Sequence, residues 1–116
     1  MVSLHTLLEG YPDAVRISAS DIPATEITLV VLDDDPTGTQ SVADLPVLTR
    51  WKEDDMVWAL QQDVSAIYVM TNSRSLDPVD ARAINLDVAH AAIAAAKKLD
   101  KKVAFAVSYT HLRAHE

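Results

Sequence analysis

Short apolar runs alternate along this chain with longer segments in which apolar residues recur at helical spacing. The run Ile27–Leu32 is continuous and rich in β-branched residues. A short run of this kind is typical of a strand that is buried on both faces of a parallel sheet. The same pattern predicts three further strands, at Leu45–Leu48, Ala66–Met70 and Val103–Val107.

Two segments between these strands predict helices. Glu53–Gln62 opens with acidic residues, which suit the positive end of a helix, and then places apolar residues at helical spacing. Pro78–Leu99 carries one stripe of alanines and larger apolar residues, with Asp77 as the expected N-cap. Because strands alternate with helices, we predict an α/β fold with a mainly parallel sheet and flanking helices.

The segment before the first strand, residues 1–26, is weakly patterned. Leu4, Leu7 and Leu8 predict a short helix that ends before Gly10. We expect this segment to be a lead-in that packs on the domain.

Composition and charge narrow the classes of partner and of chemistry that the chain can have. The chain has 116 residues, enough for one domain with one core, and carries a net charge of −7. An acidic surface disfavours nucleic acid and anionic membranes as partners. Cysteine is absent, which excludes disulfides and thiolate chemistry and suits a cytoplasmic location. No apolar run approaches the roughly 20 residues that span a bilayer.

Glycine is scarce, and this bears on nucleotide binding. The two glycines, Gly10 and Gly38, do not form a glycine-rich phosphate loop. A nucleotide would therefore have to bind mainly outside this chain.

An acidic turn follows the first predicted strand, where open α/β sheets bind ligands. Residues 33–39 read DDDPTGT. Three adjacent carboxylates repel one another, so the cluster is typical of a metal site, a site for sugar hydroxyls or a catalytic base. A solvated acidic turn is the simpler interpretation.

The same turn is also similar to the DxDxT signature of haloacid-dehalogenase-type phosphatases. In that hypothesis Asp33 would be the nucleophile and Asp35 the acid/base. Thr71, at the end of a later strand, would bind the phosphate.

Two longer motifs resemble the four-carbon acid sugar kinase family, which includes kinases for 3-oxo-tetronate, threonate and erythronate. Val30–Trp51 reads VVLDDDPTGTQSVADLPVLTRW and is similar to the opening motif of that family, in which DDDPTGTQ precedes PVLT and an aromatic residue. Tyr68–Pro78 reads YVMTNSRSLDP and is similar to the TNSR segment of the family. The resemblance covers residues 27–106.

The resemblance implies a two-domain kinase several times longer than this chain. A Rossmann-like N-terminal domain would bind the acid sugar, and a C-terminal domain would bind ATP. Residues 1–106 are then expected to be part of the sugar-acid-binding domain, with the ATP-binding domain absent and the fragment inactive alone. The implied reaction transfers the γ-phosphoryl group of ATP to a sugar-acid hydroxyl, with Mg²⁺ bridging the phosphates. The implied partner is a small-molecule sugar acid. Association of the protein into a homo-oligomer is compatible with the resemblance.

The resemblance also assigns roles to residues of the two motifs. Asp34 and Asp35 are the catalytic candidates, which would bind or deprotonate sugar hydroxyls. Arg74 is the candidate for pairing with the substrate carboxylate, since a guanidinium binds a carboxylate through two parallel hydrogen bonds. The other substrate-binding candidates are Asp33, Thr37, Gly38, Thr39, Asn72 and Ser73. No residue is assigned to ATP or to a metal ion.

The last ten residues, 107–116, depart from the family pattern. The family continues with an arginine and a DSTLRGH-like motif, whereas this chain reads VSYTHLRAHE, without the aspartate and with Ala114 in place of the glycine. One reading frame of a common transposase sequencing adapter encodes the same ten residues. We therefore interpret residues 107–116 as a non-native read-through tail.

These observations favour a fragment of a sugar-acid kinase. A phosphatase fragment of the DxDxT type and a non-catalytic binding domain are the alternatives. The kinase requires ATP, and the phosphatase releases phosphate without ATP. A binding domain neither consumes ATP nor releases phosphate.

Overall fold

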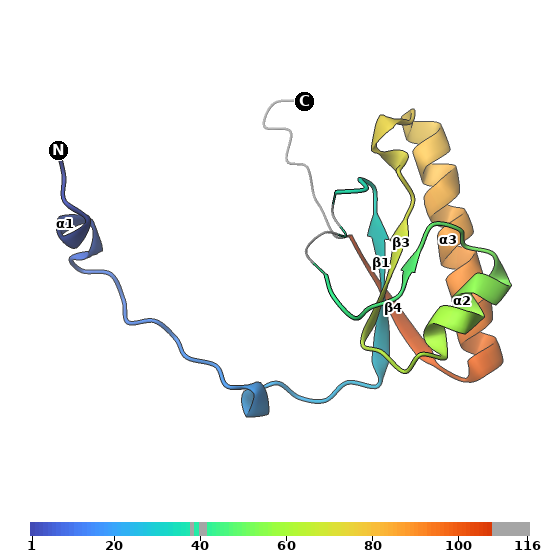
Figure 1. The fold of residues 1–116 in the computed structure, drawn as a ribbon, viewed down its shortest axis with the longest axis horizontal. Helices are drawn as coiled ribbons and strands as arrows, with labels where there is room; N and C mark the ends of the chain where they lie inside the picture. The colour runs from blue at the N-terminus through green and yellow to red at the C-terminus, as the bar shows by residue number, and fades with distance from the viewer. Residues whose placement is uncertain (38, 40–41, 108–116) are drawn as a thin grey trace.

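The computed structural model describes residues 1–37, 39 and 42–107 and has an α/β fold (Figure 1). Its four strands form one parallel sheet in the order β2-β3-β1-β4. The strands are β1 (Ile27–Asp33), β2 (Val47–Leu48), β3 (Ala66–Met70) and β4 (Lys102–Val107). The helices are α1 (Leu4–Leu8), α2 (Glu53–Leu60) and α3 (Pro78–Leu99), with short 3-10 turns η1 (Ala19–Asp21) and η3 (Ser73–Ser75). The predicted fold class is confirmed.

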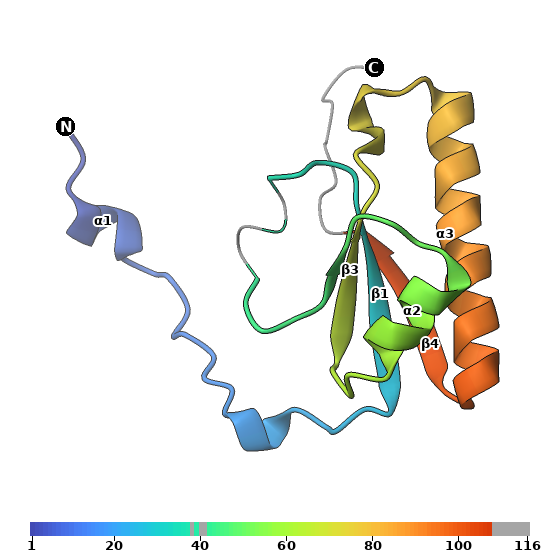
Figure 2. The ribbon, with the colours of Figure 1, turned by 45° about the vertical axis from the view of Figure 1, so that its right-hand side comes forward.

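The strand register determines which loops meet. β1 lies between β3 and β4, and all three run in the same direction. Asp33, the last residue of β1, lies opposite Met70, the last residue of β3. The segments that follow these two strands therefore leave the sheet side by side at its carboxyl edge (Figure 2).

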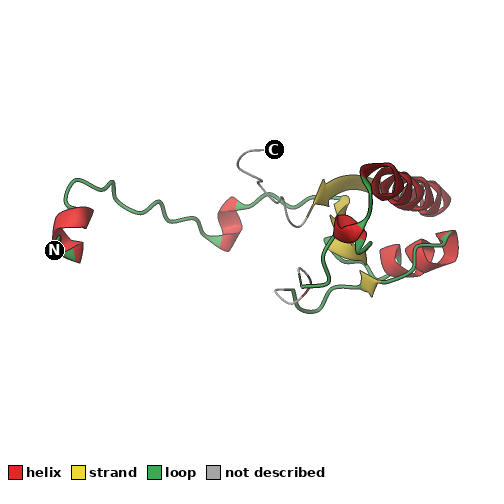
Figure 3. Cartoon of the chain, turned by 90° about the horizontal axis from the view of Figure 1, so that it is seen from above, coloured by secondary structure: helices red, strands yellow, loops and turns green. Residues whose placement is uncertain are grey.

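One face of the sheet forms the core. Helices α2 and α3 pack against each other and against this face (Figures 2 and 3). Val30, Ile67 and Val69 of the sheet are fully buried there, together with Met56 and Leu60 of α2. The buried residues of α3 are small, namely Val88, Ala92, Ala95 and Ala96. Small side chains let a helix approach a sheet closely, so the predicted alanine stripe is confirmed as a packing surface.

The opposite face of the sheet carries no helix in the part of the chain that the structure describes (Figure 3). Ile27, Leu29 and Val47 lie on this face and are 40%, 41% and 41% exposed. Alternate residues of a strand point to opposite faces, so the first half of β1 is buried more completely toward the helices, whereas Val31 and Asp33 near its end are also buried on the other side. The stabilising burial is therefore concentrated between the sheet and α2 and α3.

Local chemistry explains where elements begin. The strand predicted at Leu45–Leu48 is shortened to β2, because Pro46 has no N–H to donate to the sheet. The carbonyl of Pro46 still accepts a hydrogen bond from the Tyr68 amide at 2.9 Å. Asp77 is the N-cap of α3, with Pro78 at the first position as predicted, although the Asp77 side chain makes no capping hydrogen bond.

The expectation that residues 1–26 pack on the domain is wrong. Every residue of this segment is exposed, and α1 buries no side chain. The segment runs away from the sheet (Figure 1), and the radius of gyration is 18.5 Å, against about 13 Å for a compact domain of this length. A five-residue helix presents too little apolar surface to offset the entropy lost when a long segment docks.

Candidate functional site

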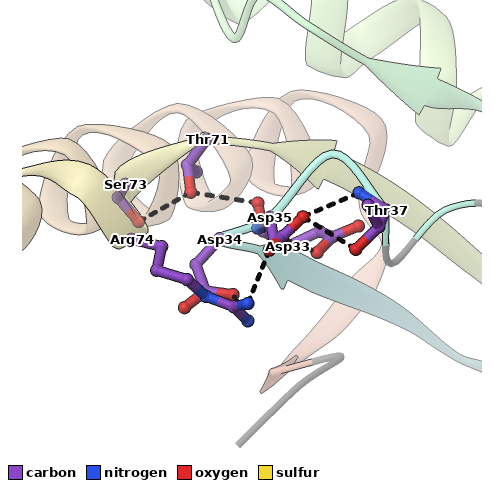
Figure 4. A network of polar contacts seen from close by, with 7 residues as sticks. All are labelled: Asp33, Asp34, Asp35, Thr37, Thr71, Ser73 and Arg74. Atoms are coloured by element: carbon purple, nitrogen blue, oxygen red, sulfur yellow. Dashed lines mark hydrogen bonds and ion pairs between the residues drawn. The ribbon is translucent and has the colours of Figure 1, made fainter. Parts of the chain in front are cut away.

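The acidic turn and the segment after β3 are joined at the carboxyl edge of the sheet. The Thr71 amide donates to the Asp33 carbonyl at 2.8 Å, and the Arg74 amide donates to the Asp34 carbonyl at 3.2 Å. These backbone bonds hold together two segments that are about 40 residues apart in the sequence. The side chains of the two predicted motifs therefore form one cluster (Figure 4).

Asp33 lies at the base of this cluster and is completely buried. One carboxylate oxygen, Oδ1, accepts a hydrogen bond from the Asp35 amide at 3.3 Å. The other oxygen, Oδ2, is buried and has no hydrogen-bond partner among the described residues. A buried acceptor without a partner costs roughly 1–3 kcal/mol. A buried acceptor of this kind calls for a partner outside the described residues, such as a water molecule or an ion.

Asp35 shapes the turn through Thr37. One oxygen of its carboxylate, Oδ1, accepts from the Thr37 amide at 2.9 Å and from the Thr37 hydroxyl at 2.7 Å. This is the local Asx-type arrangement that Asp-Pro-Thr sequences favour, since proline presets the turn. The Thr37 amide and hydroxyl, and to a smaller extent Arg74, hold the pKa of Asp35 below its ordinary value of 3.8. Asp35 is therefore a carboxylate at neutral pH.

Replacing Thr37 with alanine is expected to raise the pKa of Asp35 toward 3.8, because the hydroxyl donor is lost while the amide donor stays. A group with a depressed pKa stabilises the fold above its unfolded-state pKa, and this stabilisation is lost as pH falls through the folded-state value. The Asp35 contribution to the free energy of unfolding should therefore be smaller in the variant, and its loss on acidification should be complete at a higher pH. An NMR titration of the Asp35 carboxyl carbon measures the shift. An unchanged titration midpoint would contradict the role of the hydroxyl.

Arg74 bridges the carboxylates of Asp34 and Asp35. Its Nη2 lies 3.1 Å from Asp34 Oδ1, and its Nη1 lies 2.5 Å from Asp35 Oδ2. The Arg74 side chain is 34% exposed, and those of Asp34 and Asp35 are 32% and 22% exposed. The guanidinium offsets the repulsion between adjacent aspartates, which explains how the turn tolerates them. Arg74 is thus paired within the protein.

The TNSR segment has a structural role at its first three positions. Asn72 has a φ of 51°, in the left-handed region that asparagine tolerates better than most residues. This conformation turns the chain into η3 and carries Arg74 back over the acidic turn. The Ser73 hydroxyl is buried and lies 3.0 Å from the Thr71 hydroxyl, which lies 3.2 Å from the Asp33 carbonyl.

Thr71 is a residue that the sugar-site prediction omitted. Its amide and hydroxyl both contact the Asp33 carbonyl, so it joins β1 to β3 beneath the site. The sequence offered one signal that Thr71 belongs to the site, namely its position directly after a predicted strand. Thr71 is buried, and its hydroxyl is engaged by the Asp33 carbonyl and the Ser73 hydroxyl, so its contacts within the described residues are structural.

The remaining predicted residues lie in or near the turn. Thr39 donates from its hydroxyl to the Pro36 carbonyl at 3.4 Å. The side chain of Asn72 is exposed. Gly38 and the predicted tail after Val107 lie outside the described residues, and the predictions for them stay predictions. The structure thus brings together Asp33, Asp34, Asp35, Thr37 and Arg74.

Two other kinds of feature are absent from residues 1–37, 39 and 42–107. No three histidine, cysteine, aspartate or glutamate side chains converge in a way that could hold a metal ion. No helix in these ranges is long and apolar enough to cross a membrane.

Comparison with known proteins supplies one match. A family model described as the sugar-binding N-terminal domain matches residues 29–109, more than two thirds of the chain. No curated protein and no solved structure matches the chain. The matched range includes every residue of the cluster described above.

Proposed function

Because this chain belongs to the family of sugar-binding N-terminal domains of four-carbon acid sugar kinases, we propose that its carboxyl-edge cluster binds a four-carbon acid sugar. Threonate, erythronate and 3-oxo-tetronate are the proposed ligands. The observation that carries the proposal is the meeting of carboxylates and a guanidinium in one partly exposed cluster, at Asp34, Asp35 and Arg74.

The ligand chemistry matches the two kinds of group in the cluster. Sugar hydroxyls donate hydrogen bonds, and the carboxylate oxygens of Asp34 and Asp35 accept them. A sugar acid also has a carboxylate, which a guanidinium binds through parallel charge-assisted hydrogen bonds.

The proposed reaction of the full-length parent is transfer of the ATP γ-phosphoryl group to a sugar-acid hydroxyl. ATP and Mg²⁺ would bind mainly to a second domain, in keeping with the lack of a glycine-rich phosphate loop in this sequence. Phosphoryl transfer depends on positioning and on charge neutralisation. In this proposal Asp34 and Asp35 orient the acceptor hydroxyl and take its proton, in a cytoplasmic enzyme.

The DxDxT phosphatase is the weaker candidate, because of the positions of two residues. A nucleophilic carboxylate must reach the phosphorus atom, but Asp33 is completely buried and one of its oxygens accepts from the Asp35 amide. Thr71, the phosphate-binding residue of that hypothesis, is buried and bonded to the backbone of β1.

Titration calorimetry of this chain with a ligand panel tests the proposal. We expect at least one of threonate, erythronate and 3-oxo-tetronate to bind, and threitol, an uncharged four-carbon polyol, to bind more weakly. Failure of all three acids to bind would contradict the proposal, as would equal binding of threitol. With the full-length parent, ADP release on the same panel reports the kinase reaction.

A further inference from the structure

The cluster has a feature that sugar-acid binding alone does not explain. The guanidinium that should receive the ligand carboxylate is already held by Asp34 and Asp35. The same two contacts occupy Asp34 Oδ1 and Asp35 Oδ2, which are oxygens that should receive ligand hydroxyls. In the free chain, the group expected to bind the ligand carboxylate and the groups expected to bind its hydroxyls are therefore paired with each other.

Resting on the proposed function, we infer that Arg74 is a latch that a ligand carboxylate opens. In the free chain the guanidinium bridges Asp34 and Asp35. When a sugar acid enters, its carboxylate takes the guanidinium, and the released aspartate oxygens accept the ligand hydroxyls. A carboxylate and hydroxyl groups on the same small molecule are both needed to complete this exchange.

The backbone of the site allows the side chain to move independently. The Arg74 amide is bonded to the Asp34 carbonyl, and the Thr71 amide is bonded to the Asp33 carbonyl. Neither bond involves the guanidinium, so the two loops stay joined when the side chain moves. Asp35 Oδ1 still accepts hydrogen bonds from the Thr37 amide and hydroxyl, and these bonds maintain the conformation of the turn.

Exposure makes the exchange energetically close to balanced. All three side chains are between one fifth and about one third exposed, so water screens their interaction. Partly exposed ion pairs of this kind are weak, because solvent competes for both partners. A ligand carboxylate replaces one carboxylate–guanidinium contact with another, and the ligand hydroxyls then supply the net gain.

Opening the latch also changes Asp35. Arg74 is one of the groups that hold the pKa of Asp35 below 3.8, after the Thr37 amide and hydroxyl. Moving the guanidinium to the ligand removes this contribution and makes Asp35 a stronger proton acceptor. The latch would thus couple recognition of the acid end of the substrate to activation of the group beside its hydroxyl. A polyol without a carboxylate would leave Asp35 paired.

Arginine side-chain NMR of the full chain tests the latch, with Arg74→Lys used to assign the Arg74 Nε–H signal. Asp34→Asn is expected to shift this signal in the free protein, because one partner of the guanidinium is changed. In protein saturated with the acid of the panel that binds most tightly, the same substitution should shift the signal much less, since the ligand now holds the guanidinium. In protein saturated with threitol the shift should persist. Asp35→Asn provides a second variant, and Asp87→Asn, an exposed carboxylate of α3, controls for loss of one negative charge.

The outcomes separate the latch from the proposed function. If Asp34→Asn and Asp35→Asn shift the Arg74 signal equally with and without the bound acid, the contacts persist on binding and the latch is wrong, while sugar-acid binding stands. If neither variant shifts the signal in the free protein, the latch is also wrong. If threonate, erythronate and 3-oxo-tetronate all fail to bind the unaltered chain, the proposed function is overturned and the latch with it.

Discussion

Replacing Arg74 with alanine is expected to weaken the binding of threonate to this chain by roughly ten- to a hundredfold. The estimate rests on the loss of the positive charge that neutralises the bound state, since like charges about 4 Å apart repel by roughly 1–4 kcal/mol between bulk water and a protein surface. The substitution also leaves Asp34 and Asp35 without their shared counter-ion, so the ligand carboxylate would approach two uncompensated negative charges. Calorimetric titration of both proteins with threonate measures the change.

The matched control for this experiment is Arg16→Ala. Arg16 is exposed in the N-terminal segment, which runs away from the sheet (Figure 1), so this substitution removes the same charge at a distance from the cluster. We expect its threonate affinity to be unchanged. Equal losses in the two variants would show a general charge effect, and an unaltered affinity in Arg74→Ala would remove Arg74 from the binding site.

Replacing Leu60 with alanine is expected to lower the free energy of unfolding by roughly 2–5 kcal/mol. Leu60 is 1% exposed and belongs to the core between α2 and the sheet. The loss combines the transfer energy of the deleted groups with the cavity that remains. The effect should be large for this chain because its burial is concentrated on one face of the sheet. Urea unfolding followed by circular dichroism measures the difference.

Leu86→Ala is the control, since it deletes the same atoms from a leucine of α3 that is 46% exposed. We expect this variant to lose about half as much stability as Leu60→Ala or less, because Leu86 removes only about half of its surface from water and its deletion leaves no enclosed cavity. Similar losses in the two variants would mean that burial against α2 and α3 does not dominate the stability of the chain.

The cluster combines a rigid framework with exchangeable contacts. Backbone bonds between β1 and the segment after β3, together with the buried hydroxyls of Thr71 and Ser73, define where the loops lie. The contacts of Arg74 are partly exposed and are made by side chains alone. A ligand can therefore rearrange the charges at this site without disturbing the fold that presents them.

The sequence alone was sufficient for the features that arise from local interactions. The strands and helices follow from the spacing of hydrophobic residues. The bounds of β3 and α3 agree with the prediction, and at the start of α3 the hydrophobic spacing coincides with the signals of a capping aspartate and a proline. The Asp35–Thr37 turn is also local, since donor and acceptor are two residues apart. The two motifs were also sufficient to point to the sugar-binding family.

Tertiary structure decided the features that depend on residues far apart in the chain. The pairing of Arg74 with Asp34 and Asp35 spans about 40 residues and exists because β1 and β3 are neighbours in register. The burial of Asp33, the exposure of residues 1–26 and the choice of sheet face that the helices cover likewise depend on packing. Hydrophobic period and turn chemistry report each residue's immediate neighbours, whereas burial and charge pairing are determined by which strands lie side by side.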